Sequence, residues 1–179
     1  MTDMEFGLLG PLLVRRGGTV IPVPRGNQRT VLAELLLAAN QVVPVDRIAE
    51  TLWGARPPPS ARVTVRNYVK RLRRALGEEG QARITAQPRG YLITVGAREL
   101  DVTRFEALLA SARTAAAQQS WDDAAARARA ALALWRGRPL ADVEADVLTV
   151  RNVPRLEELR RRRWKRASTP TCTGGATPS

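Results

Sequence analysis

The sequence contains no histidine and a single cysteine, Cys172. These absences exclude an intrachain disulfide, a zinc site and the Cys–His and Ser–His–Asp arrangements, because each needs histidine or several cysteines. No other constellation of nucleophile, base and metal ligand is visible in the sequence. We therefore expect a protein that is not an enzyme and that needs no metal or other cofactor.

Long apolar runs are missing as well. The segment Met1–Phe6 holds two acids and no apolar core follows it, so the sequence does not predict a signal peptide. No apolar stretch approaches the roughly 20 residues that a membrane-spanning helix needs. We expect a cytoplasmic protein with no membrane contact.

Positive charge is abundant and unevenly distributed. The chain carries 29 Lys and Arg against 17 Asp and Glu, a net charge of +12. Residues 1–98 hold 15 basic and 7 acidic residues, whereas residues 99–154 hold 7 and 8. Such an excess favours a polyanionic partner. The pattern indicates a basic nucleic-acid module beside a neutral module that is structural or contacts protein.

The most informative segment is Ser60–Gly77, which reads as one amphipathic helix with Ser60 as its N-cap. Its apolar residues recur at i, i+4, i+7 and i+11, and they are Val65, Val69, Leu72 and Leu76. The rest of the helix is basic and lacks acids, which suits a DNA major groove. A merely solvated surface helix is the alternative, but such helices usually interleave Glu with Lys or Arg.

The order of predicted elements is strands, three helices and a hairpin. Apolar runs between turn residues predict strands at 5–8, 12–15 and 19–23. Helical periodicity predicts a first helix that begins at Arg25 or Asn27 and has Asn40 as its C-cap, followed by helices at 44–53 and 60–76. A polar connection at 77–82 leads to a hairpin of strands 83–87 and 90–95. This order is that of a winged helix-turn-helix, with 60–76 as recognition helix and 83–95 as wing.

The residues also resemble a known family. Leu52-Trp53-Gly54, the basic run at 70–77 and Gly90-Tyr91-Leu92 look like the DNA-binding domain of OmpR/PhoB-type response regulators. The segments at 100–102, 132–137 and 139–143 resemble the bacterial transcriptional activator domain. This combination is similar to the SARP/AfsR-type regulators of actinobacteria. The resemblance implies an activator of a secondary-metabolite gene cluster.

From the residues themselves, Asp101–Gln119 and Ser120–Trp135 predict an antiparallel helical pair similar to a tetratricopeptide hairpin. We expect Trp121 and Trp135 to be core anchors of this pair. A further helix is predicted at 153–162.

The predicted fold is therefore α+β, in three parts. Residues 1–96 form the OmpR/PhoB-type winged helix, 97–162 a partial helical activator domain, and 163–179 a disordered tail. The domain is expected to be truncated at its C-terminus. With GC-rich codons assumed for 163–179, a shifted reading frame restores apolar helical spacing, so a frameshift is one hypothesis. A natural basic tail that adds non-specific DNA affinity is the other.

The resemblance places the recognition helix in the major groove and the wing in the adjacent minor groove. The candidate DNA-contacting residues are Trp53, Arg62, Thr64, Arg66, Asn67, Lys70, Arg71, Arg73, Arg74, Thr85, Gln87 and Arg89. Arg71 matches a family position that reads bases, whereas Arg66, Lys70 and Arg73 could pair with phosphates. Arg89 is the residue expected to enter a minor groove.

The expected partner is double-stranded DNA, bound as promoter direct repeats by two or more protomers, because the interface of one module is small. The resemblance also implies a contact with RNA polymerase, since the loop 54–59 lies where the family makes it. A stiff interhelical loop with no partner is the alternative for this segment. Two other functions stay open. A non-specific architectural DNA-binding protein would show little difference between sequences. A protein-interaction scaffold built on the helical pair would not bind DNA at moderate salt.

Overall fold

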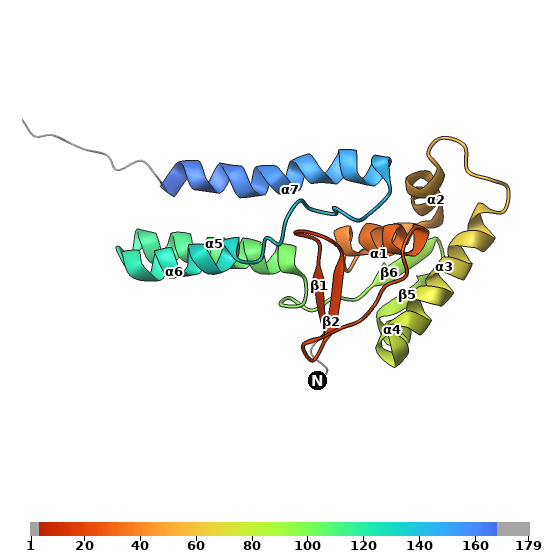
Figure 1. The fold of residues 1–179 in the computed structure, drawn as a ribbon, viewed down its shortest axis with the longest axis horizontal. Coiled ribbons are helices and arrows are strands. Elements are labelled where there is room, and N and C mark those ends of the chain that lie inside the picture. Colours follow the sequence, from red (N-terminus) through yellow and green to blue (C-terminus); the bar gives the residue numbers. More distant parts are fainter. Residues whose placement is uncertain (1–3, 168–179) are drawn as a thin grey trace, which may run out of the picture.

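The computed structural model describes the backbone of residues 4–167 and the side chains of residues 4–161. Its elements follow one another as a small sheet, helices α1 to α4 with a second small sheet, and helices α5 to α7. The sheets and the first helices gather into one body, from which α5 and α6 extend (Figure 1). The fold is α+β, as expected.

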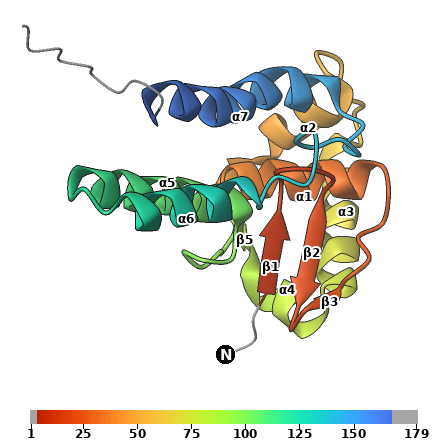
Figure 2. The ribbon, with the colours of Figure 1, turned by 60° about the vertical axis from the view of Figure 1, so that its left-hand side comes forward.

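The N-terminal sheet is an antiparallel meander that lies across α1 (Figure 2). Its strands are β1 (Met4–Gly7), β2 (Leu13–Arg16) and β3 (Thr19–Val20). Gly17 and Gly18 form the second turn with φ of 54° and 82°, a left-handed backbone that glycine adopts without steric cost. The third strand is shorter than predicted because Pro22 has no N–H to donate to a ladder.

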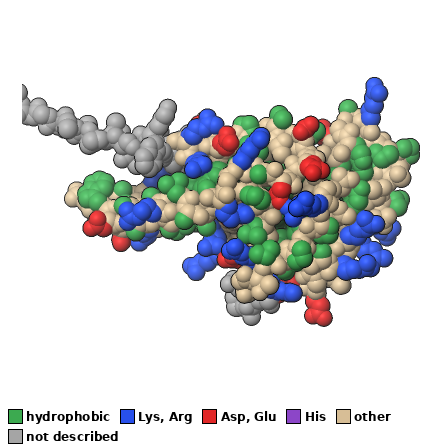
Figure 3. Space-filling model, in the orientation of Figure 1, with side chains coloured by type: hydrophobic (Ala, Val, Ile, Leu, Met, Phe, Trp, Pro, Cys, Tyr) green, Lys and Arg blue, Asp and Glu red, His purple; other side chains and the backbone are tan. Residues whose placement is uncertain are grey.

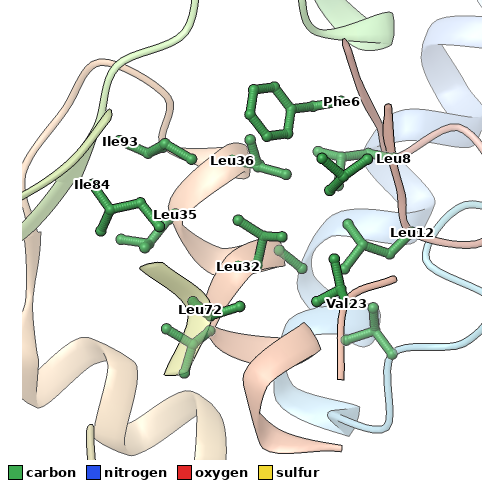
Figure 4. Packing of buried hydrophobic residues seen from close by; sticks show 14 of the residues in the cluster. Phe6, Leu8, Leu12, Val23, Leu32, Leu35, Leu36, Leu72, Ile84 and Ile93 are labelled. Atoms are coloured by element: carbon green, nitrogen blue, oxygen red, sulfur yellow. The ribbon is translucent and has the colours of Figure 1, made fainter. Parts of the chain in front are cut away.

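Three helices build the core against this sheet. They are α1 (Asn27–Leu37), α2 (Val45–Trp53) and α3 (Ala61–Ala75). The apolar stripe predicted for α3 is confirmed, because Val65, Val69, Leu72 and Leu76 are at most 1% exposed. This stripe shares one core with Leu32 and Leu35 of α1 (Figure 4). Burial of the stripe fixes which side of α3 is turned to solvent.

The predicted wing is confirmed as a hairpin in a second sheet. The sheet has the order β4 (Val43–Pro44), β6 (Gly90–Ile93) and β5 (Ile84–Gln87), all antiparallel. A Cβ atom at Gly90 would lie 1.9 Å from the carbonyl oxygen of Val43. Only glycine therefore lets the wing approach β4, which directly precedes α2.

Three local expectations in this part are wrong. The polar connection at 77–82 is a helix, α4 (Gly77–Arg83), which begins where Gly77 turns the chain with φ of 73°. The Ser60 side chain makes no capping hydrogen bond, although its carbonyl accepts the N–H and hydroxyl of Thr64. Asn40 lies beyond the end of α1 at Leu37, and its side chain instead pairs with both main-chain groups of Val95.

The predicted helical pair is confirmed as α5 (Asp101–Ala117) and α6 (Trp121–Leu132). Trp135 is an anchor, with its ring edge-on to Phe105 at 5.4 Å between centroids and the Arg160 guanidinium 5.2 Å from its centroid. The expectation for Trp121 is wrong, because this residue is 67% exposed. It is the first residue of α6, at the end of the pair that points away from the core (Figure 1).

The last helix, α7 (Asp146–Ala167), is longer at both ends than the predicted 153–162. It begins seven residues earlier, where Leu148 is fully buried in the main core. It also continues through the first five residues of the predicted tail. Residues 168–179, with Cys172 and the rest of the predicted disordered tail, lie outside the described residues.

Two acids from the second half of the chain hold the turn between β1 and β2. The buried Asp101 carboxylate accepts the backbone N–H of Leu8 and of Leu9, both at 2.9 Å or less, and Asp142 accepts that of Leu12 at 2.7 Å. Burial raises the pKa of Asp101, while these N–H donors and Arg136 act in the opposite direction. The activator-like helices are thus joined to the winged helix through main-chain donors.

A second junction connects α7 with α1 and α2. The fully buried Glu34 carboxylate accepts hydrogen bonds from Arg47 and Thr51 of α2 and from Arg151 of α7, the last at 2.9 Å. A buried charge is tolerated when it is paired and hydrogen-bonded in this way. Glu34 therefore fixes the start of α7 beside α2 (Figure 1).

Candidate nucleic-acid interface

Helix α3 presents a basic side to solvent. Three exposed residues, Asn67, Lys70 and Arg74, recur at helical spacing directly opposite the buried stripe. No acid occurs in Ala61–Ala75. Figure 3 shows Lys and Arg side chains along the edge of the molecule where Figure 1 places α3. The outward side of α3 therefore offers hydrogen-bond donors and positive charge without a neighbouring acid on the same helix.

The other predicted residues of α3 divide between its two flanks. Helical spacing places Thr64 and the exposed Arg71 on one flank, and Arg62, Arg66 and Arg73 on the other. The second flank faces the wing, because the Arg73 Nε atom donates to the Ile84 carbonyl at 2.8 Å. Arg73 is half-buried and joins α3 to β5. Arg66 and Arg71 are exposed and make no ion pair within residues 4–161.

The wing residues differ in how far they reach. Gln87 and Arg89 are exposed at the hairpin turn, whereas Thr85 is half-buried and accepts a weak hydrogen bond from Gln87 at 3.4 Å. The main chain of Arg89 is anchored, since its carbonyl accepts the Val45 N–H at the start of α2. A fixed backbone with a free side chain suits insertion into a groove.

The base of the wing is held by a bidentate ion pair. Arg83, at the end of α4, donates to both carboxylate oxygens of Glu99 at 2.6 and 2.7 Å. These hydrogen bonds lower the pKa of Glu99. The pair ties the wing to the segment that leads into α5, so wing and helical pair share one support.

Trp53 ends α2 and is half-buried against the main core. The loop 54–59 follows, with Gly54 at φ of 67° and exposed side chains at Ala55, Pro57 and Pro59. This loop leads directly into α3. A contact at the loop would therefore lie next to the basic side of that helix.

Sequence reasoning missed one acid on this surface. Asp46, in the first turn of α2, forms an ion pair with Arg62 at 3.1 Å. Both residues line a hollow of about 450 Å³ between α2, α3 and the wing turn. Their separation of 16 residues lies across two elements, so no local pattern in the sequence indicates the pair.

Within residues 4–167, no helix combines the length and apolar character that a bilayer crossing requires. The same part of the chain holds no group of three or more acidic or cysteine side chains arranged to bind a metal ion.

Two known domain families match this arrangement. The family "Transcriptional regulatory protein, C terminal" matches residues 24–93, and the "Bacterial transcriptional activator domain" matches residues 100–168. The first match covers α1 to the wing, and the second covers α5 to α7.

Individual proteins are similar to this chain over most of its length. Regulatory protein DnrI of Streptomyces peucetius is 40% identical over 88% of this chain and 61% of its own length. Transcriptional regulatory protein MoaR1 of Mycobacterium tuberculosis is 37% identical over 79% of this chain and 47% of its own. The structure of Mycobacterium tuberculosis EmbR in complex with a low-affinity phosphopeptide matches 92% of this chain and 44% of that one, with a TM-score of 0.83 and 32% identity.

The chain spans about half the length of these relatives. In this chain the two domain matches follow one another, and the contacts of Asp101 and Glu34 join them. The protein therefore belongs to the SARP/AfsR-type bacterial transcriptional regulators, in which an OmpR-type winged helix precedes a bacterial transcriptional activator domain.

Proposed function

We propose that this protein binds double-stranded DNA sequence-specifically and activates transcription of a secondary-metabolite gene cluster. The observation that carries the proposal is the solvent side of α3, where Asn67, Lys70 and Arg74 stand opposite the buried stripe on a helix without acids. A helix of this kind fits the major groove, where its donors meet base edges and phosphates.

In this proposal each predicted residue has a stated role. Arg71 donates to guanine on one flank of α3, while Arg66 and Lys70 pair with phosphates that set the register. Arg89 enters the adjacent minor groove from the wing tip. Arg73 holds α3 against the wing through Ile84 and contributes charge. The remaining contacts to bases and backbone come from Trp53, Arg62, Thr64, Asn67, Arg74, Thr85 and Gln87.

The partners follow from the size and position of this surface. A single module of this type buries only about 600–1,000 Å² on DNA, so two or more protomers on direct repeats supply the affinity that one lacks. The loop 54–59 is the proposed contact for RNA polymerase, since its three prolines preform an exposed surface next to α3. A regulator bound to the chromosome acts in the cytoplasm.

A salt-titrated binding assay tests this function. The protein is titrated against its own upstream DNA and neighbouring promoters, with scrambled duplex as competitor. Selective binding that changes its base preference at one position in Arg71→Ala is the expected result. Equal binding to scrambled duplex, with a steep salt slope, would instead indicate an architectural DNA-binding protein. Absence of DNA binding at moderate salt would instead indicate a protein-interaction scaffold built on the helical pair.

A further inference from the structure

One acidic side chain stands within the basic surface described above. Asp46 is 79% exposed and its partner Arg62 is 76% exposed, with Arg62 Nη2 lying 3.1 and 3.4 Å from the two carboxylate oxygens. Exposed ion pairs of this kind are weak because water and salt screen both charges. Arg62 can therefore exchange Asp46 for another anion without any change in the fold.

The pair lies where a DNA strand would pass between α3 and the wing. The hollow of about 450 Å³ is lined by the start of α2, the start of α3 and the wing turn with Gln87 and Arg89. Among the lining residues in the described part of the chain, Asp46 is the one acid, and Arg62 and Arg89 are the cations. A phosphate entering the hollow would meet both guanidinium groups and the Asp46 carboxylate.

The backbone around Asp46 cannot retreat from that phosphate. The N–H of Val45 donates to the Arg89 carbonyl at 3.1 Å, which fixes the first turn of α2 against the wing. The neighbouring residues are also held, because Pro44, just before Val45, pairs in the sheet with Gly90, just after Arg89. The carboxylate consequently stays at the surface, and only the Arg62 side chain is free to change partner.

Resting on the proposed DNA-binding function, we propose that Asp46 competes with DNA phosphate for Arg62 and so lowers affinity for DNA, most of all on the duplex that α3 fits. When α3 docks in register, a phosphate reaches Arg62 and replaces Asp46, so the ion pair is lost on binding. On a non-cognate duplex α3 sits less deeply, Arg62 stays with Asp46, and no ion pair is broken. Asp46 therefore limits the affinity of the in-register complex.

The test measures Asp46→Asn against two probes, a duplex enriched by the wild-type protein from a random pool and its scrambled version. We expect affinity for the enriched duplex to rise about two- to fivefold, the range that an exposed ion pair supports, with a smaller rise on the scrambled duplex. Asp122→Asn is the matched control, because it makes the same charge change at an exposed site in α6, away from this surface.

A double-variant cycle separates competition for Arg62 from simple repulsion. If Asp46 acts through Arg62, Asp46→Asn has little further effect in a chain that also carries Arg62→Ala. Asp46→Ser serves as a second neutral variant that keeps a residue suited to a helix start, with far-UV circular dichroism confirming the fold.

Three results would overturn the inference. They are an Asp46→Asn effect no larger than that of Asp122→Asn, an equal rise on both duplexes, and a rise that persists unchanged without Arg62. The last two outcomes leave the proposed function intact. A wild-type protein that binds neither duplex would overturn the proposed function as well.

Discussion

Replacing Asp101 by alanine should destabilise the whole chain, because this one carboxylate joins the activator-like helices to the winged helix. It accepts the backbone N–H groups of Leu8 and Leu9 and lies 3.3 Å from a guanidinium nitrogen of Arg136. Alanine supplies no acceptor. Both buried N–H groups would then lose their partner while Arg136 would lose its carboxylate.

The expected size follows from those lost partners. A buried donor left without an acceptor costs about 1–3 kcal/mol, and two such donors set an upper limit of about 6 kcal/mol. Local relaxation and water entry reduce this figure, so we expect a loss of about 2–4 kcal/mol in the free energy of unfolding. For a chain of this length each kcal/mol lowers Tm by about 2–4 °C, which gives a drop of about 4–16 °C.

Urea and thermal unfolding followed by far-UV circular dichroism measure this loss. Arg136→Gln is the matched control, because it removes the guanidinium but leaves the Leu8 and Leu9 bonds to Asp101 in place. The control should cost clearly less than Asp101→Ala. A loss below about 1 kcal/mol in Asp101→Ala, or an equal loss in both variants, would refute the assignment of the junction to the two N–H bonds.

Three further predictions concern the wing and α3. Gly90→Ala should lose about 3 kcal/mol of stability and most DNA affinity, because the new methyl would lie 1.9 Å from a carbonyl oxygen of β4. A variant that is as stable as the parent and binds DNA fully would contradict this packing. Glu99→Gln should cost about 1–2 kcal/mol at pH 7 in urea titrations. Because Arg83 lowers the pKa of Glu99 below its ordinary 4.5, this stabilisation is present above that value and is lost as pH falls through the folded pKa. A gap that does not shrink as the pH is lowered below 4.5 would argue against it. Arg73→Ala should lower stability by about 1 kcal/mol and keep base preference. Arg71→Ala should keep stability and change base preference, and selection from a random duplex pool distinguishes the two variants.

The elements with strong periodicity could be predicted from the sequence. The α3 stripe at 65–76 follows the helical repeat, and the wing follows from a turn between two apolar runs. Helix α4 could not be predicted this way, because a short polar segment beginning with glycine carries no apolar repeat. The prediction that Trp121 is a core anchor is wrong for a different reason. A large apolar residue indicates burial only where another element covers it.

In the candidate site, too, features of a single helix could be predicted from the sequence and contacts between elements could not. The basic side of α3 is a property of one helix and is visible in its residues. The partners of Arg62 and Arg73 depend on how α2 and the wing pack beside that helix, and no local pattern records them. The junctions through Asp101 and Asp142 span 93 and 130 residues and end on backbone N–H groups, which every residue type except proline possesses.

The hydrogen bonds from the β1–β2 turn to Asp101 and Asp142 can form only late in the synthesis of the chain on the ribosome. Leu12 meets its acceptor only after residue 142 has been made, 130 residues later. At about 5–20 residues per second, that interval is roughly 7–26 s. Throughout it the Leu12 N–H has only water as partner, so the first strands to be synthesised are among the last to be completed.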